Sequence, residues 1–276
     1  MPGPLEITSA ANPRVKRLAR WRAKPAERRA AGVALAEGVR EVERAVAAGL
    51  RCRALWRCPG LLGGRATPAT PAGAEGLTCP PAVFEKVAWH RRPEGLLGEF
   101  EAPAWTLGSL PPTPPDGLYL VAVETEKPGN LGAMARTASA AGCCAVLAVG
   151  PHVDPFHPAA VRNSTAAVFS LPVVAVPDAG AALAFLKERG IALHAALVDA
   201  LPPPSGGIVR RAPGSTSGGG GAVAVAIGPE DRGLPAVWAE AADAAVGIPM
   251  ADGPVDSLNA AAAAAVLLFE HRRVRR

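Results

Sequence analysis

The second half of the chain alternates apolar strand segments with helical segments. The strand segments, such as residues 118–124, 144–150 and 221–228, are apolar on consecutive residues instead of on every second residue. Helical patterns, as in residues 130–142, 157–169 and 180–190, separate them. Strands that are apolar on both faces and are connected through helices are typical of a parallel sheet covered on both sides. We therefore expect an α/β fold built on a parallel sheet.

A proline-rich stretch divides the chain of 276 residues, a length that suits two domains. Residues 101–117, EAPAWTLGSLPPTPPDG, lack periodicity and are expected to form a linker. Residues 1–100 predict a smaller α/β domain, and residues 118–276 predict the larger one. The Gly/Pro-rich residues 201–221 interrupt the larger domain with a loop whose role the sequence leaves open. Their glycines precede a strand, whereas the GxGxxG fingerprint follows one, so a nucleotide-binding oxidoreductase is disfavoured.

Basic residues gather near the two ends of the chain. The net charge is +5, residues 14–29 hold eight basic residues against one acid, and the chain closes with HRRVRR. Such clusters favour a polyanionic partner, with nucleic acid first, although solvated helix faces produce the same pattern.

The five cysteines have neither CxxC spacing nor a zinc-ligand pattern with histidine. We expect reduced thiols in a cytoplasmic protein without a metal site. The first residues, MPGPLEITSAANPRVKR, contain no apolar signal segment, and no apolar run is long enough to predict a membrane span.

Three polar stretches are placed where a sheet of this kind binds ligands. In VETEKPGNLGAMARTASAAG, residues 123–142, Asn130 occupies a helix N-cap position and Arg136 follows two turns later. In residues 226–250 a strand ends at Gly228, before Glu230, at the carboxyl edge that binds ligands in open α/β sheets. In DSLNAAAAAAVLLFE, residues 256–270, a serine and an asparagine flank the start of a helix. Each residue alone is also compatible with a plain cap or a surface position.

Taken in this order and spacing, the three stretches resemble the signature motifs of the SpoU-type (TrmH-like) RNA ribose 2′-O-methyltransferases of the SPOUT superfamily. The resemblance extends over residues 118–272. In the N-terminal part, ITSAANPRVKRL and ALAEGVREVERAVAAG resemble the L30e-like RNA substrate-binding domain that precedes the catalytic SPOUT domain in many members. The family resemblance implies a parallel sheet with a C-terminal deep trefoil knot. It also implies S-adenosylmethionine as cofactor and a homodimer formed through the catalytic domain.

The resemblance also implies the site residues. For the cofactor they are Gly228, Ile248, Pro249, Met250, Ser257 and Leu258. For catalysis they are Arg136, Asn130, Glu230, Ser257 and Asn259. For RNA binding, the basic N-terminal helix and the segment after the first motif contribute Arg14, Lys16, Arg17, Arg20, Arg22, Arg162, Asn163 and Ser164. Arginine is essentially always protonated, so we expect Arg136 to orient the target phosphate instead of acting as a free base.

The sequence departs from the family pattern in three places. Ala166 stands where glycine is common, Glu124 and Glu126 replace the usual aspartate–proline turn, and the loop over residues 201–221 is longer than typical. The separate N-terminal domain favours 23S or other ribosomal RNA over transfer RNA as substrate. Family members that confer resistance to ribosome-targeting antibiotics share this two-domain layout, so that role is a further alternative. A tRNA methyltransferase and a non-catalytic ribosome-assembly factor of the same fold remain the alternatives.

Overall fold

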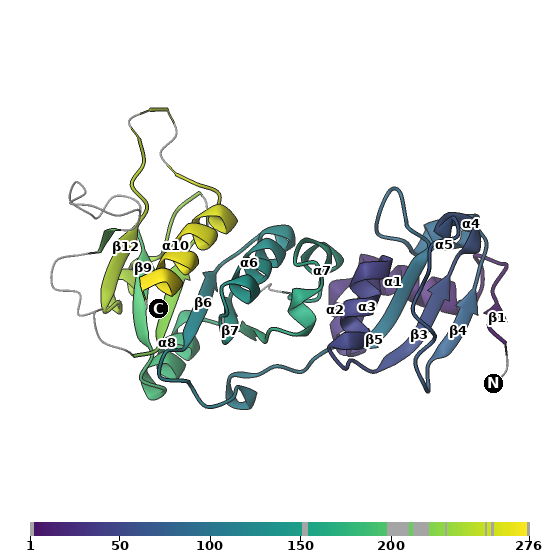
Figure 1. The fold of residues 1–276 in the computed structure, drawn as a ribbon, viewed down its shortest axis with the longest axis horizontal. Helices are drawn as coiled ribbons and strands as arrows, with labels where there is room; N and C mark the ends of the chain where they lie inside the picture. Colours follow the sequence, from purple (N-terminus) through teal and green to yellow (C-terminus); the bar gives the residue numbers. More distant parts are fainter. Residues whose placement is uncertain are drawn as a thin grey trace. The chain divides into compact units, whose positions relative to one another are not determined.

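The computed structural model describes residues 3–150, 154–197, 210–211, 221–229, 231–251, 253–254 and 257–274 (Figure 1). Its contacts divide the chain into two compact units. Unit 1 comprises residues 1–104 together with 156–170, and unit 2 comprises residues 105–155 together with 171–276.

Unit 1 is built on a five-stranded mixed sheet. Its order is β1 (Leu5–Glu6), β4 (Glu75–Thr78), β3 (Cys52–Arg57), β5 (Leu96–Glu101) and β2 (Val33–Glu37). β5 runs antiparallel to both of its neighbours, and β4 runs parallel to both of its own. The helices are α1 (Pro13–Ala23), α2 (Pro25–Ala30), α3 (Val39–Ala47), α4 (Pro59–Leu62) and α5 (Pro81–Val87).

Residues 156–170 belong to unit 1 although they lie in the second half of the sequence. The sequence predicts one helix over residues 157–169, and this prediction is wrong in detail. The structure has a short helix α7 (Pro158–Asn163) and a 3₁₀ turn η2 (Ala167–Phe169). The helix breaks because Thr165 and Ala166 have φ values of 51° and 65°, which a right-handed helix does not permit.

Unit 2 contains a seven-stranded sheet. Its order is β10 (Arg210–Arg211), β12 (Ala244–Gly247), β9 (Ala192–Ala196), β11 (Val223–Ile227), β6 (Leu118–Val123), β7 (Ala145–Val149) and β8 (Val173–Val176). All pairs are parallel except β10 with β12. The predicted parallel α/β sheet is therefore confirmed, and the predicted loop 201–221 includes a short antiparallel strand.

Helices cover the sheet of unit 2, as its apolar strands require. They are α6 (Pro128–Ala140), α8 (Ala179–Glu188), α9 (Ala236–Glu240) and α10 (Ala260–Val274). Every residue of β6, β7 and β11 is buried, so both faces of these strands contribute to the core. Trp105 and Leu107 pack against this core, so the end of the proline-rich stretch belongs to unit 2. Within the described part of the chain, no helix is long and apolar enough to cross a membrane.

Candidate functional site

A pocket opens at the carboxyl ends of three neighbouring strands of unit 2. The strands β12, β9 and β11 lie side by side, and the residues that follow each of them line the pocket. Leu197 follows β9, Gly228 follows β11 and Ile248 follows β12. Parallel α/β sheets bind ligands at this edge because the loops there leave backbone groups exposed.

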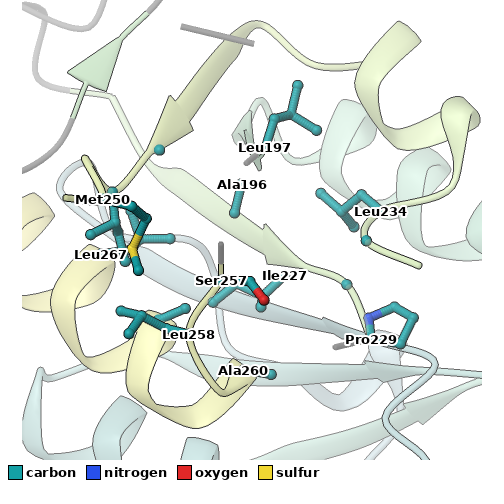
Figure 2. Close-up of a pocket in the computed structure, with 15 residues that line it drawn as sticks. Ala196, Leu197, Ile227, Pro229, Leu234, Met250, Ser257, Leu258, Ala260 and Leu267 are labelled. Atoms are coloured by element: carbon teal, nitrogen blue, oxygen red, sulfur yellow. The ribbon is translucent and has the colours of Figure 1, made fainter. Parts of the chain in front are cut away.

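The lining of the pocket is mostly apolar, as is usual for sites that bind small molecules. Met250, Leu258 and Leu267 lie on one side, with Leu234 and Pro229 on the opposite side (Figure 2). The side chains supply contact area, so polar recognition depends on the backbone groups at the strand ends and on the one hydroxyl, that of Ser257.

Gly228 allows the loop after β11 to fold back on itself. A Cβ atom there would lie 2.5 Å from the Gly233 carbonyl carbon and 2.6 Å from the Leu234 nitrogen. These are backbone atoms, so no side-chain rotation relieves the clash. Because Pro229, Gly233 and Leu234 all line the pocket, the glycine determines the shape of this wall.

The alanine-rich helix α10 forms another wall. Ala260 and Ala263 line the pocket, and larger side chains at these positions would extend into it. The Asn259 side chain accepts a hydrogen bond from the Ala261 amide at 3.0 Å, so this residue caps the helix. The predicted cofactor residues Gly228, Ile248, Met250, Ser257 and Leu258 all line the pocket, and Pro249 lies half-buried between two of them.

A buried histidine pair fixes α10 to the sheet. The Leu267 carbonyl can only accept, so the His271 Nδ1 atom at 2.7 Å carries the proton. The His271 Nε2 atom then accepts from His194 Nδ1 on β9, at 2.8 Å. Leu267 lines the pocket, so this hydrogen-bond chain positions the pocket wall. The sequence analysis missed both histidines, because a lone histidine in an apolar segment carries no pairing signal.

A second, polar cavity adjoins the first between the ends of β6 and β11. It contains about 530 Å³ of open space and shares Gly228, Pro229 and Ala260 with the apolar pocket. The strand order changes direction between β6 and β11, which is where open α/β sheets place a substrate. Its polar lining comprises Thr125, Glu126, Lys127, Asn130 and Asp231. Asn130 is thus brought to this cavity, but the prediction that it is the helix N-cap is wrong. The helix α6 begins at Pro128 with Lys127 in the cap position, so Asn130 lies in the first turn.

Ion pairs connect the two loops beside this polar cavity. Arg232 donates to Glu124 at 2.9 Å and lies 3.7 Å from Glu126. Glu124 has a φ of 47°, a conformation that few side chains adopt, so this departure from the family turn is tied to a strained backbone. The sequence shows the two acids but does not indicate their partner, which is distant along the chain.

Three predicted catalytic residues are not placed in these cavities. Asn259 caps α10 and lines neither cavity. Arg136 lies on the exposed face of α6 and lines neither cavity, and it forms no ion pair with the residues that the structure describes. Glu230 falls outside the described residues. In the parts of the chain that are described, no cluster of three or more His, Cys, Asp or Glu side chains is arranged to hold a metal.

Some of the predicted RNA-binding side chains are exposed, and others form ion pairs or hydrogen bonds within the chain. On α1, Lys16 is exposed, whereas Arg14 pairs with Glu75 at 2.9 Å, Arg17 with Glu99 at 3.5 Å and Arg20 with Glu27 at 3.6 Å. Arg22 donates to the Ala88 carbonyl at 2.5 Å.

In the segment 156–170, Asn163 is exposed but its neighbours are committed to packing. Arg162 forms ion pairs with Glu41 at 3.1 Å and Glu94 at 3.3 Å. The buried Ser164 hydroxyl donates to the Val161 carbonyl. The Ser164 side chain, which is predicted to contact RNA, is therefore buried and hydrogen-bonded within its own segment.

Comparison with known proteins agrees with this geometry. Residues 117–269 match the SpoU rRNA Methylase family, and residues 12–98 match the MRM3-like substrate binding domain. A 23S rRNA (uridine(2479)-2′-O)-methyltransferase of Streptomyces viridochromogenes is 31% identical over 71% of this chain. The 23S rRNA (guanosine-2′-O-)-methyltransferase RlmB of Ralstonia nicotianae is 30% identical over 74% of this chain. The chain spans 66% of the Streptomyces protein, just under two thirds, and 80% of the Ralstonia protein.

Solved structures are similar over nearly the whole chain. An RNA 2′-O ribose methyltransferase has a TM-score of 0.80 and 37% identity, covering 98% of this chain and 99% of its own. An rRNA methyltransferase of Sinorhizobium meliloti, solved with bound S-adenosylmethionine, has a TM-score of 0.80 and 27% identity, covering 97% of both chains. The family match covers more than half of the 276 residues. The chain belongs to the SpoU rRNA methylase family.

Proposed function

We propose that this protein transfers a methyl group from S-adenosylmethionine to a ribose 2′-hydroxyl of RNA, with ribosomal RNA as the substrate. One observation carries the proposal: an apolar pocket and a polar cavity meet at Gly228, Pro229 and Ala260. A nucleoside cofactor and a polar acceptor group therefore have adjoining places. Residues 118–276 carry the catalysis in this proposal, and residues 1–100 bind the RNA.

The apolar pocket fits the cofactor. Its apolar lining, its glycine-dependent wall and its strand-end backbone groups suit an adenosine moiety held by main-chain hydrogen bonds. The residues that would hold it are Ile248, Met250, Ser257 and Leu258, next to Gly228. When bound, S-adenosylmethionine supplies a methyl group already activated by its positively charged sulfur.

The chain must position the hydroxyl and direct its proton away as the new carbon–oxygen bond forms. Asn130 and Lys127 line the polar cavity, where an amide and an ammonium orient a ribose and its phosphate. The Glu126 carboxylate in the same lining is an acceptor for a hydroxyl proton. These groups contribute by orientation, which accounts for a large share of catalysis when the leaving group is already good.

Arg136 completes the site only if a second subunit supplies it. It lies on the exposed face of α6, the helix that packs on α10, and Phe269 of α10 is 50% exposed. An exposed aromatic next to small residues at the end of α6 is typical of an oligomer surface. We infer a homodimer in which Arg136 reaches the polar cavity of the partner subunit and binds the target phosphate.

The substrate assignment follows the relatives and the N-terminal unit. The curated relatives named above act on 23S rRNA by their names, and the N-terminal match is to a substrate-binding domain. The cytoplasmic location and a role in antibiotic resistance stay predictions.

The test is methyl transfer with S-adenosylmethionine labelled in the methyl group. The protein is incubated with deproteinised ribosomal RNA or transfer RNA, and the RNA is digested to nucleosides. We expect label in 2′-O-methylnucleosides from ribosomal RNA. Label only in transfer RNA would favour the tRNA alternative, and label in a base or in no RNA would contradict the proposal. Arg136→Ala should abolish transfer while cofactor binding persists.

A further inference from the structure

The turn between α5 and β5 exposes an aromatic ring in a basic setting. Its sequence, residues 88–95, is AWHRRPEG. Trp89 is 38% exposed, whereas Trp56 and Trp238 are 0% and 1% exposed. Arg91 and Arg92 are exposed on the same turn. A tryptophan ring at the surface between basic side chains offers a flat apolar face to a ligand.

The turn is held rigidly by groups beneath it. The carboxylate of Glu37, which is 7% exposed, accepts hydrogen bonds from the Trp89 and His90 amides. Arg22 of α1 donates to the Ala88 carbonyl. Burial raises the pKa of the Glu37 carboxyl, and the two amide hydrogen bonds oppose that shift. The buried Glu37 carboxylate thus holds the backbone of the exposed Trp89 in place through hydrogen bonds.

The indole ring is oriented by its neighbours and only partly covered. The His157 ring meets it edge-to-face, with centroids 4.9 Å apart and an interplanar angle of 86°. No described aromatic ring is stacked parallel on Trp89. The ring is therefore preorganised, which lowers the entropic cost of binding a flat partner.

The charges of this turn are less neutralised than those of α1. Arg91 and Arg92 form no ion pair with any residue of the described ranges. On α1, by contrast, Arg14 and Arg17 pair with Glu75 and Glu99. An arginine without a carboxylate partner is available to a phosphate at a smaller cost, because no existing ion pair has to be broken.

We propose that Trp89 stacks on an unpaired base of the RNA substrate while Arg91 and Arg92 bind the adjoining phosphates. The choice of RNA as ligand rests on the proposed function. Stacking on an indole requires a free base face, which a duplex does not offer, and unpaired segments are the usual targets of sequence-tolerant aromatic contacts. Unit 1 thus binds a single-stranded loop or bulge through this turn, and α1 contributes general attraction.

The first test compares RNA binding by variants of the full chain, using a short fluorescein-labelled oligouridylate and a duplex RNA of equal length. Trp89→Ala should weaken oligouridylate binding about tenfold, the loss of one stacked base, and change duplex binding by less than about twofold. Trp89→Phe should retain most of the affinity. Equal binding of oligouridylate by wild type and Trp89→Ala, or an equal loss for duplex, would overturn the proposal.

The second test measures the salt dependence of the same binding. Replacing both Arg91 and Arg92 by alanine should lower the salt slope by about 1.4, the value for two single-strand phosphate contacts. The matched control is Arg51→Ala, an exposed arginine paired with Glu101 outside the turn, which should leave the slope unchanged. An unchanged slope in the double variant would refute the phosphate contacts.

A third measurement separates this inference from the proposed function. Trp89→Ala should bind S-adenosylmethionine as wild type does and should raise KM for ribosomal RNA while leaving kcat nearly unchanged. If wild type binds no S-adenosylmethionine and transfers no methyl, the proposed function fails even where the stacking results hold. If transfer proceeds and Trp89→Ala leaves KM unchanged, the stacking inference alone fails.

Discussion

Replacing Gly228 by alanine tests whether the loop after β11 shapes the cofactor pocket. The added Cβ would meet three backbone atoms of Gly233 and Leu234 at 2.5–2.6 Å, distances that real Cβ atoms essentially never show. The loop must therefore move, and overpacking of this kind costs about 1–3 kcal/mol. If the displaced loop must return to bind the cofactor, that cost becomes a roughly 5- to 160-fold weaker Kd.

The assay is calorimetric titration of S-adenosylmethionine into the variant, with thermal unfolding as a check on folding. The matched control is Gly221→Ala, at the amino end of the same strand, where an added Cβ meets nothing within 4 Å. We expect the control to bind as wild type does. If a folded Gly228→Ala protein keeps the wild-type Kd, the reasoning that this loop forms the cofactor wall is refuted.

Four further predictions follow from the structure. Ala263→Leu should place a side chain in the apolar pocket and abolish cofactor binding without unfolding the protein, as titration and circular dichroism would show. Asn259→Ala removes the cap of α10 and should lower the free energy of unfolding by about 1 kcal/mol in denaturant titration. Ala166→Gly relieves a φ of 65° and should raise Tm. Burial raises the pKa of Cys79 and Cys143 to about 12 from 9.0, so stability should fall as pH rises from about 9 toward 12, and both thiols should resist maleimide near neutral pH.

Each of these outcomes has a clear contrary result. Cofactor binding by Ala263→Leu with wild-type affinity would place the ligand elsewhere. An unchanged free energy for Asn259→Ala would assign the start of α10 to tertiary packing. A lower Tm for Ala166→Gly would show that the buried methyl group outweighs the backbone strain. Rapid labelling of Cys143 in the folded protein would contradict its burial.

The parallel sheet could be predicted because its strands carry an unambiguous pattern. Consecutive apolar residues in β6, β7 and β11 require cover on both faces, and the structure buries all of them. The ends of these strands then fall at one edge by topology alone. Gly228 and Ile248, which the family resemblance implies as cofactor residues, line one pocket because each follows one of the neighbouring strands β11 and β12, and Ser257 joins them from the start of α10.

Tertiary contacts decided what the sequence pattern could not. The predicted helix over 157–169 has a helical apolar pattern, yet it breaks at Thr165 and Ala166. There the Thr165 carbonyl accepts from Arg44, a residue 121 positions away. Arg162 was expected to bind RNA because its segment resembles the family's segment after the first motif, whereas its two acidic partners come from elsewhere in unit 1. Pairing across such sequence distances leaves no local signal.

Mapping 2′-O-methylated positions in ribosomal RNA is the most direct test of the proposed methyl transfer to a ribose 2′-hydroxyl. Ribosomal RNA from cells with and without the protein is cleaved in alkali, which spares the bond next to a 2′-O-methylated ribose. We expect a position in 23S rRNA that is protected from cleavage only when the protein is present. This protection should be lost when the protein carries Arg136→Ala. Identical cleavage patterns in all three samples would contradict it.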